Sequence, residues 1–542
     1  MGNRFRDALE QGEFVVTCEI IPGRGAREDG QEREFEEAKR MYETGRVHAM
    51  SITDNPGGNP ALLADTLGKE FLDQGIVPLV HFTCKDRSRN QIIAQLYGLE
   101  RQGLENILFM TGDYQATGWT GRARPVFDLD SVHVQMLASE MNAGLVVPGR
   151  KGDVVEKPTH FYNGGVVNPF KYLEGETIPQ YLKMEKKIIA GAQFLITQLG
   201  YDARKMEELI RYRDERGFDT PIIGNVFLLT RGAAKLMQKG AIAGCYVSDE
   251  LLATLEEEAK AEDKGKAARI ERAAQMVAIY KGLGYAGVHI GGFGINADML
   301  NTILDRAEEL APEWRECVKK VSFGKPGGYF VYEPEIGEDG QPTGLNVPVK
   351  SPKPEQARSR KVFEKWGISR FFHHWMLTLG KRGNKVLTSR EDSLDRKKGV
   401  YRHHGLEHVG KSMLYGCMDC GDCGLEATLY TCPMTQCPKC QRNGPCGGTY
   451  DGWCEVFPGE RYCIWYKAYH KAKKENEMER ITSYITPPNH WELFNSSPWS
   501  AYTHRRDNCA GRIPVSLGLE TGAPGGVTDE TDLLKKVDTH LP

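Results

Sequence analysis

The stretch FVVTCEII at residues 14–21 is the first of eight short β-rich runs in the N-terminal 320 residues, and GVHIGG at 287–292 is the last. Six more runs lie between them: VHAMSIT (47–53), VPLVHFTC (77–84), ILFMTG (107–112), THFYN (159–163), FLITQ (194–198) and PIIGNV (221–226). Helical stretches separate the runs, and several end on glycine, a frequent helix stop. Eight strand–helix units in about 300 residues predict an α/β protein with a (β/α)8 TIM barrel. A doubly wound open sheet is the alternative, but no G-x-G-x-x-G motif follows the first strand.

Composition changes twice after the barrel. Residues 321–357 are rich in glycine and proline, which indicates a domain boundary. The segment SRKVFEKWGISRFFHHWMLTLGKR (359–382) has the pattern of an amphipathic docking helix. We therefore predict three parts: a barrel at 1–320, a linker with a docking helix at 321–410, and a small cysteine-rich metal-binding domain of α+β or irregular structure, with a wrapping tail, at 411–542.

Charge and hydropathy exclude some functions. The chain of 542 residues carries 70 Lys+Arg against 73 Asp+Glu, so its net charge of -3 gives no electrostatic case for nucleic-acid binding. No apolar run approaches about 18 residues, so we expect no membrane insertion. The N-terminal stretch has no apolar signal region, and we expect a cytoplasmic protein with reduced thiols.

Polar residues stand at or near the ends of the predicted strands, where a barrel of this kind places its chemistry. Glu19 lies within an apolar run, where an unpaired carboxylate costs several kcal/mol and its pKa tends to rise. The other polar residues of this rim are Thr53, Asp54, His81, Asp113, Gln198 and His289.

The motifs around these residues resemble a known family. They are TCEIIPG around Glu19, SITDNPGGNP around Thr53, PLVHFTCKD around His81, TGDY around Asp113, PVFDLDSVHVQ around Phe127, KKIIAGAQFLITQLGYD around Gln198, and GVHIGG. Together, and in this order, they resemble the flavin-dependent 5,10-methylenetetrahydrofolate reductases. The resemblance implies a barrel that holds FMN, with FAD less expected, and that interconverts 5,10-methylene- and 5-methyltetrahydrofolate.

The resemblance also implies residue roles. Glu19 is implied to be the acid that protonates the departing ring nitrogen, a step that suits a carboxyl with a raised pKa. Asp113 is implied to bind the pterin and tune the flavin, and Gln198 to contact the folate. The positions implied to hold FMN are Thr53, His81, Thr111, Gly112, Asp113, Phe127, Tyr162, Lys187 and His289. Three features depart from the family: Thr111 stands where many members have arginine, Gln180 where they have an acidic residue that binds the ribityl chain of FMN, and FYNGGVVNPF has an extra glycine pair after the fifth strand.

Nine of the 14 cysteines fall between positions 417 and 463. Cys417, Cys420 and Cys423 have the spacing C-x2-C-x2-C, and a C-x4-C-x2-C run begins at Cys432. Nine thiols suffice for two four-ligand sites with one left over. We expect the first three to share a site with either Cys432 or Cys463, and a second site to be drawn from Cys437, Cys440, Cys446 and Cys454.

The spacing of the cysteines does not decide which metal they bind. One or two [4Fe-4S] clusters, structural zinc, or one of each fit the thiol pattern, and disulfides fit a reduced compartment least. The segments LEHVGKSMLYGCMDCGDCGL and CPKCQRNGPCGG and the tail PPNHWELFNSSPWSAYTHRRD resemble the C-terminal or partner-subunit module that accompanies methylenetetrahydrofolate reductase in acetogens and related anaerobes.

The resemblance to this module implies the electron source. Iron–sulfur clusters pass single electrons, so a cluster domain beside an FMN barrel implies ferredoxin or a redox partner complex as donor. With structural zinc, NAD(P)H would be the donor. A third hypothesis makes the chain a non-redox pterin-binding or docking component of a methyltransferase assembly. We also expect the protein to form an oligomer.

Overall fold

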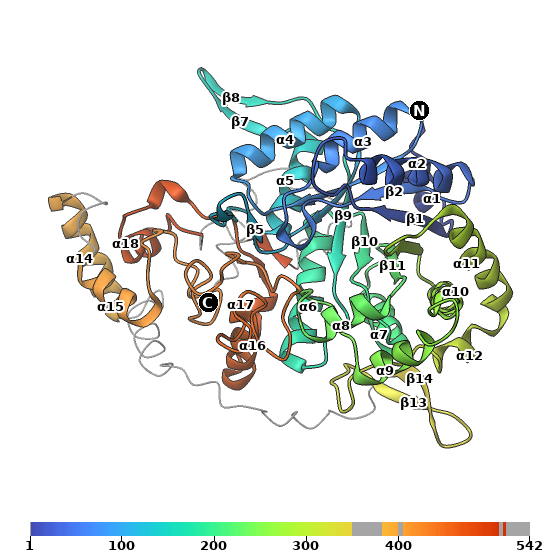
Figure 1. Cartoon of the computed structure of the whole chain (residues 1–542). Helices are drawn as coiled ribbons and strands as arrows, with labels where there is room; N and C mark the ends of the chain where they lie inside the picture. Colours follow the sequence, from blue (N-terminus) through green and yellow to red (C-terminus); the bar gives the residue numbers. More distant parts are fainter. Residues whose placement is uncertain (1, 349–381, 399–404, 509–512, 516–542) are drawn as a thin grey trace.

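The computed structural model describes residues 2–348, 382–398, 405–508 and 513–515. Eight parallel strands close into a barrel in the order β1-β12-β11-β10-β9-β4-β3-β2 (Figure 1). They are β1 (Val15–Ile20), β2 (Ala49–Ile52), β3 (Pro78–Thr83), β4 (Asn106–Met110), β9 (Tyr162–Val167), β10 (Phe194–Thr197), β11 (Ile222–Phe227) and β12 (Gly287–Gly291). The predicted barrel is confirmed.

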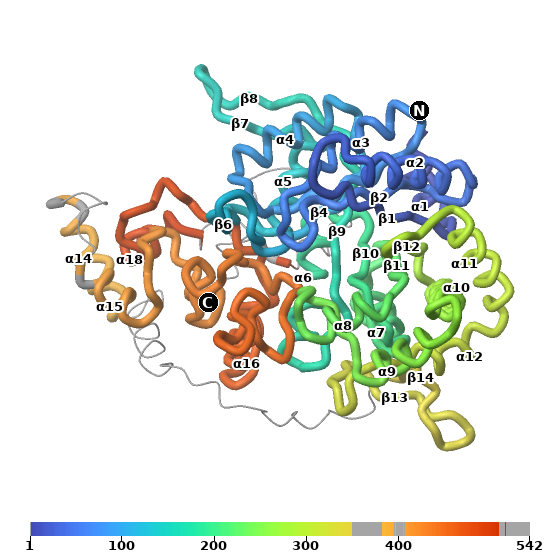
Figure 2. The backbone as a smooth tube through the Cα atoms, in the orientation of Figure 1, coloured from blue at the N-terminus to red at the C-terminus, as the bar shows by residue number. Residues whose placement is uncertain are grey.

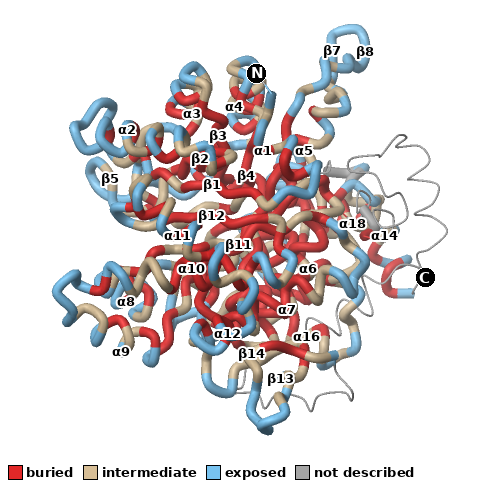
Figure 3. Tube along the Cα trace, turned by 90° about the vertical axis from the view of Figure 1, so that its right-hand side faces the viewer, coloured by how far each residue is buried: buried red, intermediate tan, exposed pale blue. Residues whose placement is uncertain are grey.

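Helices surround the barrel and bury its outer face, so the strands and the inner sides of the helices form one continuous core (Figure 3). The pattern that forms them is amphipathic: α3, for example, buries Leu67 and Phe71 on one side. The surrounding helices are α2 (Asp29–Glu43), α3 (Ala64–Asp73), α4 (Arg89–Gln102), α5 (Ser131–Ala143), α6 (Glu174–Ile189), α7 (Ala203–Glu215), α8 (Arg231–Gln238), α9 (Asp249–Glu258), α10 (Lys266–Gly282), α11 (Ala297–Leu310) and α12 (Trp314–Val318).

A short helix, α1 (Arg4–Glu10), closes the N-terminal end of the barrel. Its Phe5 is fully buried against Tyr162 and Phe194, with ring centroids 6.2 and 5.2 Å away in edge-to-face geometry. Both partners stand at the first residue of their strands. This apolar plug leaves the opposite, C-terminal rim for chemistry.

The fifth barrel strand begins three residues later than predicted. The sequence pattern predicted a strand at 159–163, whereas β9 runs Tyr162–Val167 and contains the glycine pair. A Cβ on Gly164 would lie 2.2 Å from the ring of Phe194, so glycine is needed there for the close approach of that ring. The extra glycines are therefore part of the strand rather than of the loop after it.

The C-terminal elements lie against the side of the barrel near α5 and α6, on the opposite side from α10–α12 (Figures 1 and 2). They are α14 (Arg382–Lys398), α15 (Gly405–Tyr415), α16 (Ile464–Glu475), α17 (Glu479–Thr482), α18 (Pro498–Thr503), and the pair β15 (Tyr484–Ile485) and β16 (Ile513–Pro514). Most of the cysteine-rich stretch between α15 and α16 has no regular secondary structure.

Helix α16 packs on α6. Tyr469 donates its hydroxyl hydrogen bond to Glu174 at 2.7 Å, and a Cβ on Gly175 would lie 2.9 Å from the Tyr466 ring. The linker hairpin, β13 (Glu333–Ile336) and β14 (Pro342–Val347), packs on α7. The predicted docking helix at 359–382 lies outside the described residues, apart from its last residue, which begins α14.

The remaining elements are small: the hairpins β5 (Thr117–Gly118) with β6 (Gly121–Arg122) and β7 (Val146–Gly149) with β8 (Gly152–Val155), and the 3-10 turns η1 (Pro56–Gly58), η2 (Ala311–Glu313) and η4 (Trp491–Leu493). None of the helices in the described ranges combines the length and the apolar character that a bilayer crossing requires.

Candidate functional site

The carboxylate of Glu19 lies inside the barrel near its C-terminal end. Its Oε2 is 3.5 Å from Nε2 of His289 on β12, and Nδ1 of the same imidazole is 2.9 Å from the hydroxyl of Thr17 on β1. A Cβ on Gly291 would lie 3.1 Å from the carboxylate, so glycine there leaves the acid room to turn. Two neighbouring strands thus hold Glu19 and its imidazole partner in a fixed relation.

The pKa of Glu19 differs from the sequence-based expectation. Burial raises this pKa, but the contact with the His289 imidazole outweighs burial, and the net pKa lies below its ordinary value. Burial lowers the pKa of His81 to about 4, so this imidazole is neutral at pH 7 and shares a 2.7 Å hydrogen bond with Ser51. The sequence-based expectation of a raised pKa for Glu19 is therefore wrong for the protein without bound ligands.

Two loops on the β2 and β4 side of the rim are joined by Asp113. Its Oδ2 accepts a 2.7 Å hydrogen bond from the amide of Gly57. A Cβ on Gly58 would lie 2.0 Å from the carbonyl oxygen of Tyr114, so the two loops approach at van der Waals contact. Thr53, at the end of β2, is buried, and its amide donates to the carbonyl of Ile20. Asp113 and Thr53 thus lie on the rim, as predicted.

Other predicted rim residues contact different partners. The Phe127 ring is buried and stacks on Tyr114 at 6.4 Å between centroids. Gln198 follows β10 and is half-buried, with its Oε1 accepting from the amide of Leu199. Thr111 and Gly112, which follow β4, bind the cysteine-rich domain.

Lys187 is a buried lysine on α6 that faces β9. Its Nζ donates a 2.5 Å hydrogen bond to the carbonyl of Val166, near the C-terminal end of the strand. Burial and the neighbouring charge of Lys183 lower the pKa of Lys187 to about 7. An anion placed beside a buried amine of this kind would stabilise its charged form and raise its pKa.

Several polar atoms on α5 and α6 have no hydrogen-bond partner in the described part of the chain. They are both amide atoms of Gln135, the hydroxyl of Ser131 and Nε2 of Gln180. Buried polar groups are rarely left unpaired in a native protein without an additional ligand or water. Together with Lys187 they fit a polar, phosphate-bearing cofactor such as FMN, at the positions that the sequence resemblance implied for Lys187 and Gln180.

Tyr162 is not at this rim, which corrects the sequence-based prediction. Tyr162 begins β9 and stacks on Phe194 at 5.3 Å in the N-terminal plug, at the opposite end of the barrel from Glu19. The cause is the three-residue shift of the strand: it moves the aromatic residue from the expected strand end to the strand start.

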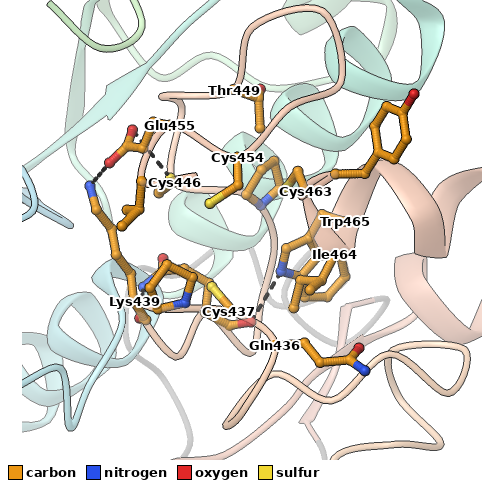
Figure 4. Close-up of a pocket in the computed structure, with 15 residues that line it drawn as sticks. Gln436, Cys437, Lys439, Cys446, Thr449, Cys454, Glu455, Cys463, Ile464 and Trp465 are labelled. Carbon is orange, nitrogen blue, oxygen red and sulfur yellow. Dashed lines mark hydrogen bonds and ion pairs between the residues drawn. The ribbon is translucent and has the colours of Figure 1, made fainter. Parts of the chain in front are cut away.

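Eight of the nine clustered cysteines line two cavities. The first cavity is lined by Cys417, Cys420, Cys423 and Cys432, together with Lys411 and Tyr415. The second is lined by Cys437, Cys446, Cys454 and Cys463, together with Trp465 (Figure 4). Each has a cavity volume of about 20 Å³. We call these the outer and the inner cavity.

The cavity linings divide the thiols differently from the division expected from their spacing. Cys432 joins the C-x2-C-x2-C thiols, one of the two options expected, whereas Cys463 rather than Cys440 completes the second set. Cys440 has a left-handed backbone with φ of 47°, and its Sγ lies 4.0 Å from the carbonyl of Met434. This conformation turns the ninth thiol away from the inner cavity.

The eight cavity thiols suit soft, positively charged ligands. Burial raises the pKa of Cys463 to about 12, and nearby thiols add to the effect. Burial likewise raises the pKa of Cys446 to about 11, with the carboxylate of Glu455 contributing. A bound metal centre reverses this balance, because it stabilises thiolates. As the described side chains stand, no three Cys, His, Asp or Glu converge tightly enough to hold one metal ion.

The cysteine-rich domain is bonded to the barrel beside the rim. Asp130 caps α5 with one carboxylate oxygen, and the other accepts from the amides of Arg442 and Asn443 at 3.1 and 3.0 Å. Asn168 after β9 donates to the carbonyl of Gly447 at 3.0 Å. Sequence reasoning missed these contacts because they join segments almost 300 residues or more apart.

Comparison with known proteins agrees with this architecture. Residues 4–307 match the family described as methylenetetrahydrofolate reductase. The chain belongs to the methylenetetrahydrofolate reductase family. Residues 400–492 match a second family, described as methylene-tetrahydrofolate reductase C terminal, which covers the domain that holds both cysteine cavities.

Curated relatives from this family share modest identity with the chain. Methylenetetrahydrofolate reductase (NADH) 1 of Arabidopsis thaliana is 24% identical over 316 residues, which are 56% of this chain and 50% of the relative. A probable methylenetetrahydrofolate reductase (NADPH) of Caenorhabditis elegans is 24% identical over 230 residues, 41% of this chain and 32% of the relative. The chain thus spans half or less of the length of these two relatives.

A solved structure also matches. It is an uncharacterized protein from Clostridium thermocellum that binds two copies of 5-methyl-5,6,7,8-tetrahydrofolic acid, 13% identical, with a TM-score of 0.40 over 57% of this chain and 99% of that protein. This TM-score is too low to support a conclusion about ligand or fold.

Proposed function

We propose that the chain interconverts 5,10-methylenetetrahydrofolate and 5-methyltetrahydrofolate at the barrel rim with FMN, and that its electrons arrive through two [4Fe-4S] clusters in the two cysteine cavities. The observation that carries this proposal is the grouping of eight thiols into two sets of four, directly beside a barrel of this family. Four thiolates per site is the ligand set of a [4Fe-4S] cluster.

The bound groups would supply complementary chemistry: reduced FMN gives a hydride, and the clusters pass single electrons. The residues of this chain would do the rest. The buried ammonium of Lys187 would pair with the FMN phosphate. Gln180, Ser131 and Gln135, whose buried polar atoms have no partner within the described residues, would hold the rest of the polar end of FMN. The cavity cysteines would hold the metal as thiolates.

Glu19 would deliver the proton that opens the imidazolidine ring of the substrate. At neutral pH its carboxyl is ionised in the ligand-free protein, because its pKa lies below the ordinary value. About 20% of the side chain is exposed, so a pterin seated beside it removes the remaining water contact and raises the pKa toward that of a proton donor. His289, 3.5 Å away, can return a proton to the carboxylate after each turnover.

Asp113 would bind the pterin while it holds the loop that contains Gly57. Gln198, half-buried at the end of β10, would contact the folate from the neighbouring part of the rim. Two loops and one strand end would therefore orient the substrate around Glu19.

A second function has one observation in its favour. The Arabidopsis relative is named for NADH, and its 24% identity extends over 56% of this chain. In that case NAD(P)H would reduce the flavin directly, and the cysteine sets would hold structural zinc.

The identity of the electron donor distinguishes these two functions. Anaerobically purified protein is given methylenetetrahydrofolate with either reduced ferredoxin or NADH, and methyltetrahydrofolate is measured. We expect turnover with reduced ferredoxin. Turnover with NADH alone, unchanged when the inner-cavity residue Cys454 is replaced by serine, would support the zinc alternative instead. A protein with neither activity and no bound FMN would overturn both.

A further inference from the structure

The side chain of Lys439 extends from the inner cavity to the barrel rim. It stands between two cysteines in the sequence and lines the cavity (Figure 4). Its Nζ donates a 2.7 Å hydrogen bond to the carbonyl of Gly112, the residue before Asp113. The same ammonium pairs with Glu455, also on the cavity wall, and both side chains are almost completely buried, at 4% and 7% exposure.

The surroundings of Lys439 keep it charged. Its ammonium forms a buried ion pair with the carboxylate of Glu455 and donates to the carbonyl of Gly112, and a buried charge is stable when it is paired and hydrogen-bonded in this way. One positive charge therefore joins a carboxylate on the wall of the inner cavity to a backbone carbonyl of the rim.

A second connection runs beside the first. The side-chain oxygen of Gln441 accepts hydrogen bonds from Thr111 on the rim and from Lys183 on α6, at 3.1 and 2.8 Å. The indole of Trp465, on the opposite wall of the inner cavity, donates to the carbonyl of Gln441 at 3.1 Å. Residues on both walls of the inner cavity are thus connected to the rim by hydrogen bonds, through Lys439 on one wall and through Trp465 and Gln441 on the other.

The outer cavity has different neighbours. Its Lys411 pairs with Glu407 on the same helix, and the Thr435 hydroxyl donates to the carbonyl of Tyr415. These two bonds stay within the cysteine-rich domain.

We propose that Lys439 is a positioning residue of the flavin site: it supplies from the cysteine-rich domain the positive charge at the Gly112–Asp113 edge, and by this charge it couples the inner cavity to the flavin. The inference rests on the proposed FMN site at this rim. A cation held there favours the reduced, more negative flavin over the oxidised one. Glu455 then acts through Lys439, since it neutralises part of that charge.

Two substitutions with opposite expected signs test this role. Lys439→Met removes the cation, so the ratio of affinities for reduced over oxidised FMN should fall about tenfold, as expected for one charge in a partly screened site. Glu455→Gln leaves the cation uncompensated and should raise the same ratio. Lys439→Arg should restore the wild-type value. The ratio is obtained from the difference between the midpoint potentials of bound and free FMN.

Lys205→Met is the matched control, because Lys205 is also a fully buried lysine paired with a glutamate, Glu208 at 2.7 Å, on α7. It should lower the melting temperature without changing the FMN potential. Equal potentials in wild type and in FMN-loaded Lys439→Met and Glu455→Gln would overturn the inference while leaving the proposed function in place. A wild-type chain that binds no FMN would overturn the proposed function and this inference with it.

Discussion

Glu19 on β1 and His289 on β12 face each other across adjacent strands, with 3.5 Å between the carboxylate Oε2 and the imidazole Nε2. This pair is the acid–base unit that the proposed reaction requires, because the substrate must receive a proton before it can accept a hydride. The hydroxyl of Thr17 binds the other nitrogen of the imidazole and thereby fixes the ring.

Replacing Glu19 by glutamine should leave FMN bound and abolish folate turnover. The amide is of the same size but carries no acidic proton, and the loss of a general acid typically costs 10²–10⁴-fold, so we expect a decrease of about 10³-fold in kcat. Flavin reduction by dithionite is the control and should be unchanged. Folate turnover within a few-fold of wild type would exclude the general-acid role.

Replacing Asp113 by asparagine should weaken folate binding and shift the flavin potential. The substitution removes a negative charge from the rim and weakens the acceptor for the Gly57 amide. We expect the folate dissociation constant to rise about tenfold, the loss of one charge-assisted hydrogen bond. If titration of the variant gives wild-type values for both quantities, Asp113 serves only to join the two loops.

FMN affinity should decrease as pH rises above 7. The pKa of Lys187 is about 7 in the ligand-free protein, and a phosphate placed beside this amine would raise it, so FMN binding takes up a proton wherever the free lysine is deprotonated. The dissociation constant should therefore increase between pH 7 and 9, by up to about tenfold per pH unit. Fluorescence titration measures it.

Lys187→Met is the comparison for this pH dependence. It should bind FMN more weakly at pH 7 and show a flat profile across the same range. A wild-type profile that is equally flat would place the FMN phosphate elsewhere.

The ninth cysteine offers an internal control for the ligand assignment. Cys420→Ser and Cys454→Ser each remove a ligand from one cavity and should each lower the iron content of the chain by about half. Cys440→Ser should keep the full iron content, because Cys440 lines neither cavity. Iron loss in Cys440→Ser, with retention in Cys454→Ser, would reverse the assignment.

Sequence periodicity predicted the barrel because each strand carries a local apolar signal. Seven of the eight strands lie within two residues of their predicted ends, and the exception is instructive. The pattern at 159–163 has the aromatic residues typical of a strand, whereas β9 contains Gly164 and Gly165, which strands normally avoid. The ring of Phe194 leaves no room for a side chain at Gly164, and a contact between separate strands has no local signal in the sequence.

The sequence predicted the rim position of those site residues that lie within a recognisable motif. Glu19, Thr53 and Asp113 lie on the rim as expected, but the lowered pKa of Glu19 depends on His289, some 270 positions away. Lys439 escaped prediction for the same reason, since its partner Gly112 belongs to a different domain. Thiol spacing predicted two sets of cysteines, and eight thiols line two cavities, whereas Cys440, with its left-handed backbone, lines neither of them.

Metal and sulfide analysis of the intact chain, purified without oxygen, tests the central claim most directly. The two sets of four thiolates predict about eight iron and eight labile sulfide per chain, together with one FMN. The absorbance spectrum should then combine a flavin band with broad absorption near 400 nm that dithionite bleaches. About two zinc per chain, without iron or sulfide, would contradict the electron relay and leave the barrel assignment unaffected.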